Sequence, residues 1–117
     1  MAEAFARHHG SGVIEPSSTG VWPASIIQPE TYQVLQERGV KLQPRPPRNI
    51  LLEGVDNAEL LVNMTGGSVV PLLHRFNGRE VLWRIRDPIG QTLDVYRAVR
   101  DQIEQKVVDL VEELRKD

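Results

Sequence analysis

The sequence of 117 residues contains no cysteine. A chain without thiols cannot form disulfides, bind a metal through thiolates or attack a substrate with a cysteine nucleophile. It also has no apolar run long enough to span a membrane, and its first residues lack the apolar core of a signal peptide. These absences predict a soluble, cytoplasmic protein that makes no contact with membranes.

The chain also lacks a strong excess of charge and any established cofactor motif. Its 14 Lys and Arg and 16 Asp and Glu give a net charge of −2, and both signs are interspersed, so no nucleic-acid partner is expected. Gly66 and Gly67 lack the spacing of a Walker or dinucleotide loop. The adjacent His8 and His9 would point in different directions on a helix and are not expected to share a metal. The sequence therefore predicts neither a cofactor nor a metal ion.

What the chain does have is a long, clearly patterned stretch over residues 79–116. Residues 80–85 are rich in β-formers and predict a buried strand, and residues 86–90 predict a tight turn. Thr92 is a suitable N-cap for a helix that follows. Apolar residues then recur every three or four positions, which predicts an amphipathic helix; they are Val95, Val99, Ile103, Val107, Leu110, Val111 and Leu114. We expect the two leucines of this stripe, Leu110 and Leu114, to be buried against the sheet or a partner.

Asp87, at the start of the turn, has two interpretations. An Asp before a proline commonly accepts hydrogen bonds from nearby backbone groups, which would make it a structural turn residue. It also lies where a strand ends and a helix begins, a position at which α/β proteins often place functional groups. There it could act as a general acid held near a reacting oxygen. The residues alone leave both interpretations open.

The first forty residues predict two helices and a short strand. The elements are a helix over 1–7, a strand at 13–14 and a helix from 29 to 39. Pro29 suits the first position of the second helix, and Gly39 suits its end. We expect Tyr32 and Leu35 to face inward.

The middle of the chain predicts a connector, a buried strand and a further helix. Residues 44–48 form a stiff proline-rich connector, whose PxxP spacing could also bind an SH3-like domain. Residues 51–57 indicate a short helical turn. Residues 59–64 are almost continuously apolar, which is typical of a strand buried on both faces of a parallel sheet, and residues 69–76 favour a helix. Because helices and strands alternate, we expect a three-layer α/β/α sandwich with a parallel sheet.

Several segments together resemble one family, the low-molecular-weight protein-tyrosine phosphatases and their arsenate reductase relatives. The similar segments are Met1–Phe5, Ser17–Gly20 in an altered form, Val34–Val40, Leu61–Thr65, Asp87–Gly90 and Tyr96–Glu104. The resemblance spans essentially the whole chain. It implies one phosphotyrosine protein phosphatase I-like domain over residues 1–117, N-terminally truncated so that the first strand is missing.

The resemblance also implies that the catalytic centre is absent. In the family, a cysteine nucleophile and a phosphate-binding arginine sit on a Cys-x5-Arg loop that precedes the segment similar to Met1–Phe5. The thiolate attacks phosphorus, and the phosphocysteine is then hydrolysed. Asp87 occupies the position of the acid that protonates the leaving group, and it would be idle without that loop. Ile89 and Gly90 stand where family members have tyrosines beside the substrate.

We therefore expect a phosphatase-like domain that does not hydrolyse phosphotyrosine or other phosphomonoesters as given. The alternative is a non-catalytic pseudo-phosphatase that serves as a protein-interaction or dimerisation module through its sheet edge or the loop around Trp22. A third possibility is binding of a phosphorylated ligand near residues 17–20 and Asp87.

A missing first strand would also affect folding. In the family this strand lies between the strands equivalent to residues 13–14 and 60–62, so its loss leaves backbone groups of residues 60–64 unpaired. Buried unpaired peptide groups cost about 1–3 kcal/mol each. Either the strand at 13–14 moves over to pair with 60–62, or a segment of a second copy enters the gap. We expect a homodimer in which residues 1–16 are exchanged.

Overall fold

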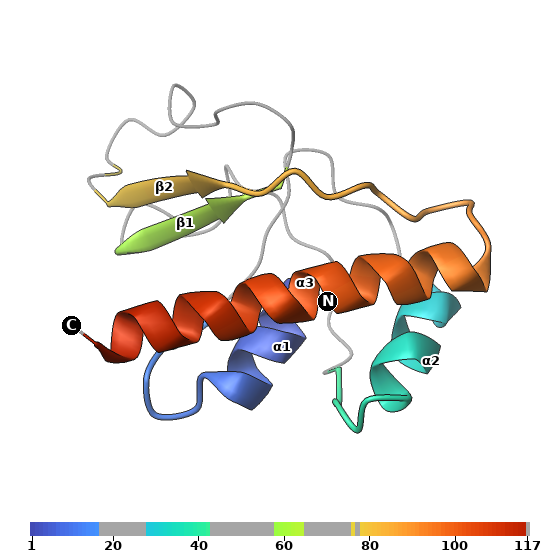
Figure 1. Cartoon of the computed structure of the whole chain (residues 1–117), viewed down its shortest axis with the longest axis horizontal. Coiled ribbons are helices and arrows are strands. Elements are labelled where there is room, and N and C mark those ends of the chain that lie inside the picture. The colour runs from blue at the N-terminus through green and yellow to red at the C-terminus, as the bar shows by residue number, and fades with distance from the viewer. Residues whose placement is uncertain (17–27, 43–57, 65–75, 77, 117) are drawn as a thin grey trace. The chain divides into compact units, whose positions relative to one another are not determined.

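The computed structural model describes residues 1–16, 28–42, 58–64, 76 and 78–116 (Figure 1). These residues belong to two compact units. The helical unit contains α1 (Ala2–His9), α2 (Pro29–Gln36) and α3 (Leu93–Arg115), and the sheet unit contains β1 (Leu60–Asn63) and β2 (Arg79–Leu82). Several predictions lie outside the described residues: the loop at 17–23, the connector at 44–48, the helical turn at 51–57, the glycines at 66–67 and all but Phe76 of the helix at 69–76.

The longest element, α3, forms where its apolar periodicity predicts it. The Thr92 hydroxyl accepts a hydrogen bond from the Val95 N–H at 3.4 Å, so the predicted N-cap is confirmed. The buried stripe consists of Tyr96, Val99, Ile103, Val107 and Val111. Leu110 and Leu114 are only half-buried, so their predicted burial is not found within this chain, and burial against a partner stays a prediction. Leu110 lies about 100° around the helix from Val111, and Leu114 lies in the last turn.

Helices α1 and α2 both pack against α3 (Figure 1). Phe5 of α1 and Val34 and Leu35 of α2 are completely buried, and together with the α3 stripe they form the core of the helical unit. The predicted inward position of Leu35 is confirmed, but Tyr32 is 38% exposed, so its predicted inward position is wrong. Val34, directly before Leu35, is buried instead, because it is on the face that α2 turns to α3.

The predicted end of α2 at Gly39 is confirmed, and α1 also ends at a glycine. The Gly10 N–H bonds to the Ala6 carbonyl at 2.8 Å and closes α1. After α2, the Val40 N–H reaches the Leu35 carbonyl and the Gly39 N–H reaches the Gln36 carbonyl, each at 3.0 Å. This pair of bonds is a Schellman motif, which requires the positive φ of 68° that Gly39 adopts.

The strand predicted at residues 13–14 is absent. The N–H groups of Val13 and Ile14 bond back to the Gly10 carbonyl at 2.9 and 3.0 Å, so the chain turns here instead of extending. Gly12 supports this turn with a φ of 79°. Gly10 lies so close to the Ile14 side chain that a Cβ on it would come within 2.6 Å of Ile14 Cγ1. Local hydrogen bonding at two glycines therefore overrides the β preference of Val and Ile.

The sheet unit contains a parallel pair, as predicted. Residues Leu60 to Asn63 of β1 lie opposite Arg79 to Leu82 of β2. Gly78 is required before β2, because a Cβ on it would come within 2.5 Å of the Glu59 carbonyl oxygen. The residues of β1 before Asn63 are only half-buried, and Asn63 itself is 4% exposed. The predicted burial of this strand on both faces is therefore wrong, and β2 ends at Leu82 rather than at residue 85.

The burial pattern predicts that Ile103 and Leu110, although both lie on α3, differ in their contribution to stability. Truncating Ile103 to Ala should lower the free energy of unfolding by about 2–5 kcal/mol, because it leaves a cavity in the core. Leu110→Ala should cost about half of that or less, since its side chain is already partly in water. Urea unfolding of the two variants measures the difference. Equal losses would contradict the assigned packing of α3.

Candidate functional site

Asp87 lies in a rigid, exposed turn between β2 and α3. One of its carboxylate oxygens, Oδ1, accepts a hydrogen bond from the Ile89 N–H at 3.0 Å. The Gln91 N–H bonds to the Pro88 carbonyl at 2.9 Å, and the Arg86 guanidinium donates to the Gln91 side chain at 3.0 Å. This arrangement confirms the structural interpretation of Asp87, because its side chain bonds to a backbone donor two residues ahead.

The same geometry is compatible with a chemical role for Asp87. Its other oxygen, Oδ2, has no hydrogen-bond partner among the described residues, and the side chain is exposed. A carboxyl group held by one oxygen and open at the other can donate or accept a proton. The general-acid role stays a prediction, because the predicted ligand loop at residues 17–20 lies outside the described residues.

The two adjacent histidines are part of the helix packing. The His8 ring meets the His9 ring edge-on at 4.9 Å, and the His9 ring is stacked on Phe5 at 6.1 Å. His9 Nε2 lies 2.9 Å from Glu104 Oε2, so this side chain connects α1 to α3. In the described part of the chain, no group of three or more His, Asp or Glu side chains could hold a metal ion.

A second polar feature of the helical unit is Tyr96, in the first turns of α3. It is 2% exposed. Burial, and after it the negative charges of Glu30 and Asp87, raise the pKa of the Tyr96 hydroxyl. Sequence analysis missed the burial of this residue, although its position three residues before Val99 on the apolar stripe was a signal for it. Glu30, in the first turn of α2, has one buried carboxylate oxygen, Oε2, and no sequence pattern indicated this burial.

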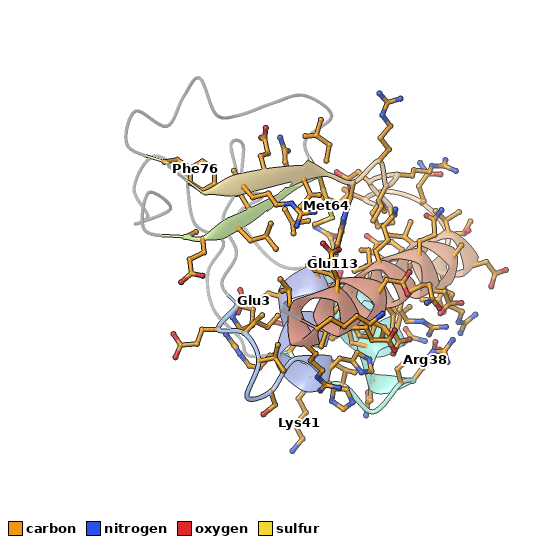
Figure 2. All side chains as sticks on the ribbon, turned by 60° about the vertical axis from the view of Figure 1, so that its left-hand side comes forward. Glu3, Arg38, Lys41, Met64, Phe76 and Glu113 are labelled. Atoms are coloured by element: carbon orange, nitrogen blue, oxygen red, sulfur yellow. The ribbon has the colours of Figure 1, made fainter. Side chains whose placement is uncertain are left out.

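A cluster of charged side chains joins α2 to α3, and sequence analysis missed it completely. Arg97 binds both carboxylate oxygens of Glu37, Oε1 at 3.1 Å and Oε2 at 2.8 Å. Arg100, whose side chain is 7% exposed, donates to Glu37 at 2.6 Å, to Asp101 at 2.9 Å and to the Val34 carbonyl at 3.1 Å. Arg38, which Figure 2 shows beside these helices, pairs with Asp101 at 2.8 Å. The cluster is structural, because its charges are paired with one another.

With the fold and these side chains described, the chain can be compared with known proteins. A sequence model of the low molecular weight phosphotyrosine protein phosphatases matches residues 1–117. The chain belongs to this family. The family assignment made from the sequence segments is therefore confirmed.

Individual members of the phosphatase family show the same relationship. A protein of Halobacterium salinarum with a provisional assignment as an arsenate reductase is 30% identical over 122 residues, which cover 100% of this chain and 84% of that protein. A protein-arginine-phosphatase of Geobacillus stearothermophilus is 26% identical over 129 residues, covering 98% of this chain and 86% of the relative.

Solved structures of family members confirm the predicted fold class. An arsenate reductase solved in its phosphate binding state superposes with a TM-score of 0.83 at 27% identity, covering 97% of this chain and 86% of that one. The chain therefore has the α/β fold of the low molecular weight phosphatases. No helix in the described part of the chain combines the length and apolar character that a membrane span requires. The cytoplasmic location stays a prediction.

The charged cluster predicts how stability depends on pH. Hydrogen bonds from Arg97 are the main cause that lowers the pKa of Glu37, and hydrogen bonds from Arg100 do the same for Asp101. Carboxyls with lowered pKa values stabilise the fold above their unfolded pKa, and this contribution is lost as the pH falls through the folded value. Thermal melting temperatures should therefore drop as the pH falls from about 5 to about 3.

The melting temperature of the Glu37→Gln variant should fall less over this pH range than that of the wild type, because the Gln side chain does not titrate. Glu112→Gln is the matched control, since Glu112 is exposed on α3 and has no ion pair among the described residues; it should keep the wild-type profile. Parallel pH profiles for wild type and Glu37→Gln would contradict the role given to Glu37.

Proposed function

We propose that a chain of these 117 residues is a phosphatase-like domain that does not catalyse the family reaction, hydrolysis of phosphotyrosine and other phosphomonoesters. The observation that supports this is the complete absence of cysteine from the sequence. Attack on phosphorus requires a nucleophile that supplies an electron pair, and in this family, by the resemblance set out above, a thiolate supplies it. Asp87 could protonate a leaving group, but protonation does not supply the missing thiolate nucleophile.

The arsenate reductase activity in the names of the relatives meets the same obstacle. Reduction of arsenate to arsenite takes up two electrons, and thiols that become oxidised are the protein groups suited to supply them. A chain without cysteine has no such groups. It can share the fold with these relatives without being able to carry out their redox step.

The purified protein should not hydrolyse p-nitrophenyl phosphate above background between about pH 5 and 8, the range over which general-acid catalysis is expected to operate. Asp87→Asn should behave identically, and since an Asn side chain still accepts the hydrogen bond from the Ile89 N–H, it should keep the wild-type melting temperature. Steady turnover that Asp87→Asn abolishes would show that the chain contains an active centre and that the proposal is wrong.

The alternative function, a non-catalytic interaction or dimerisation module, is supported by exposed apolar residues in the sheet unit. Leu82, the last residue of β2, is 55% exposed, and Met64, which directly follows β1, is 39% exposed (Figure 2). Among the described residues, the fully buried apolar side chains all belong to the helical unit. A pair of strands whose apolar side chains are partly exposed is a common place for another chain to bind. A second copy is the partner we propose.

Size-exclusion chromatography with light scattering should therefore show a homodimer at micromolar concentration. Leu82→Glu should weaken it by about tenfold or more, because a charge would be buried in the contact. Ile89→Glu is the matched control, since Ile89 is 51% exposed but lies in the helical unit. A monodisperse monomer at high micromolar concentration would rule out the dimer. A dimer that resists Leu82→Glu would favour the predicted exchange of residues 1–16 over contact through β2.

A further inference from the structure

The strand β2 bonds to β1 through alternate residues only. The Arg79 N–H reaches the Glu59 carbonyl at 2.9 Å. The Trp83 N–H reaches the Asn63 carbonyl at the same distance of 2.9 Å. In a parallel pair the bonds to one neighbour come from every second residue of a strand, so the backbone groups of Arg79, Val81 and Trp83 face β1 (Figure 1).

The residues between them turn their backbone groups to the other edge of β2. Leu82 and Arg84 make no backbone hydrogen bond at this edge within the described part of the chain. Their side chains are exposed, whereas those of Trp83 and Ile85 are half-buried. This alternation indicates that the chain stays extended as far as Ile85. The segment therefore offers a strand edge to which another extended segment can bond.

The charges along this edge are self-complementary. Glu80 precedes Leu82 by two residues, and Arg84 follows it by two. When two copies of the segment lie antiparallel with Leu82 opposite Leu82, Arg84 of each copy lies opposite Glu80 of the other, and opposite charges stabilise such a pair. Arg84 is exposed and has no ion pair within the described residues. Glu80 accepts a hydrogen bond from Asn63 at 3.1 Å, and a carboxylate with about four lone-pair sites can accept a further one.

The same register matches the neighbouring apolar residues. Val81 of each copy would lie opposite Trp83 of the other, and both side chains are half-buried in the single chain. Pairs of an aromatic and a β-branched side chain are among those that stabilise antiparallel strands. One twofold axis at Leu82 generates these pairs and the charged pairs together, as a symmetric contact between identical chains requires.

We propose that two copies of the chain associate through antiparallel pairing of β2 with β2, in the register that places Leu82 on the twofold axis. The two sheet units then form one continuous sheet. This inference rests on the homodimer proposed above and specifies its contact. A charged residue on an edge strand usually discourages pairing, but here each Arg84 meets a carboxylate. An unrelated strand would not supply the matching charges.

Arg84→Pro tests the backbone pairing. Proline has no N–H, but the Arg84 N–H is not one of those that bond to β1, so the strand pair within each chain should be kept. Arg84→Ala is the matched control, because it removes the same side chain and keeps the N–H. Sedimentation equilibrium should give Arg84→Pro a dimer Kd about tenfold or more above that of Arg84→Ala, because one backbone hydrogen bond is lost on each side of the axis.

Arg84→Glu tests the register. It would place two carboxylates opposite each other on both sides of the axis, so the dimer Kd should rise about tenfold. Arg86→Glu is the matched control, since it makes the same change of charge at an exposed arginine that would lie opposite Gly78. Its Kd should stay close to that of the wild type. The melting temperature of each variant shows whether it is folded.

NMR on a mixture of isotope-labelled and unlabelled chains observes the pairing directly. In the proposed register Val81 and Trp83 of different copies form a non-hydrogen-bonded pair, whose Cα atoms are about 4.5 Å apart. We therefore expect an intermolecular nuclear Overhauser effect between their Hα atoms.

The outcomes separate this contact from the dimer itself. A monodisperse monomer at high micromolar concentration would overturn both the homodimer and the strand pairing. A dimer with the same Kd for Arg84→Pro and Arg84→Ala would leave the homodimer in place and overturn the pairing through β2. Equal weakening by Arg84→Glu and Arg86→Glu, or the absence of the Val81–Trp83 signal in a dimer, would overturn the register. None of these results bears on the proposed lack of catalysis.

Discussion

The buried guanidinium of Arg100 is the constraint on which the helical unit depends. A cation that is almost removed from water must be neutralised and hydrogen-bonded on the spot. Glu37, Asp101 and the Val34 carbonyl do this from two different segments of the chain. Because the Val34 carbonyl and Glu37 come from α2 and its end, the requirement of one side chain sets how α2 lies against α3. The apolar residues beside it then close the core.

The helical and sheet units differ in how completely each buries its own apolar side chains. The helical unit encloses a continuous apolar core, to which each of its three helices contributes buried residues. The two strands have apolar side chains that remain half-buried or exposed, and one buried polar residue, Asn63, which donates a hydrogen bond to Glu80 at 3.1 Å. The sheet unit therefore presents apolar side chains, Met64 and Leu82, that another polypeptide could cover.

Membership of the phosphatase family indicates the fold of the chain, whereas the absence of cysteine from its composition argues against the family's chemistry. The family model and the solved relatives agree on the fold over nearly the whole chain. The thiolate chemistry that the resemblance implies needs a cysteine, and the sequence contains none. Asp87 is an example: its carboxylate accepts a hydrogen bond from the Ile89 N–H, which is enough to explain its place in the turn without a catalytic role. Packing and catalysis depend on different residues, so membership of the family establishes the fold and does not by itself establish an activity.

The sequence by itself determined the features that are decided within a few residues. The cap at Thr92, the turn at Asp87 and the helix end at Gly39 each depend on bonds between near neighbours, so the local pattern contains all that is needed. The tertiary structure alone decided the rest. Glu37 and Arg97 are 60 positions apart in the chain, and no local pattern pairs them. The burial of Val34 in place of Tyr32 likewise depends on where α3 lies, since the buried face of a helix is defined only by the element that packs against it.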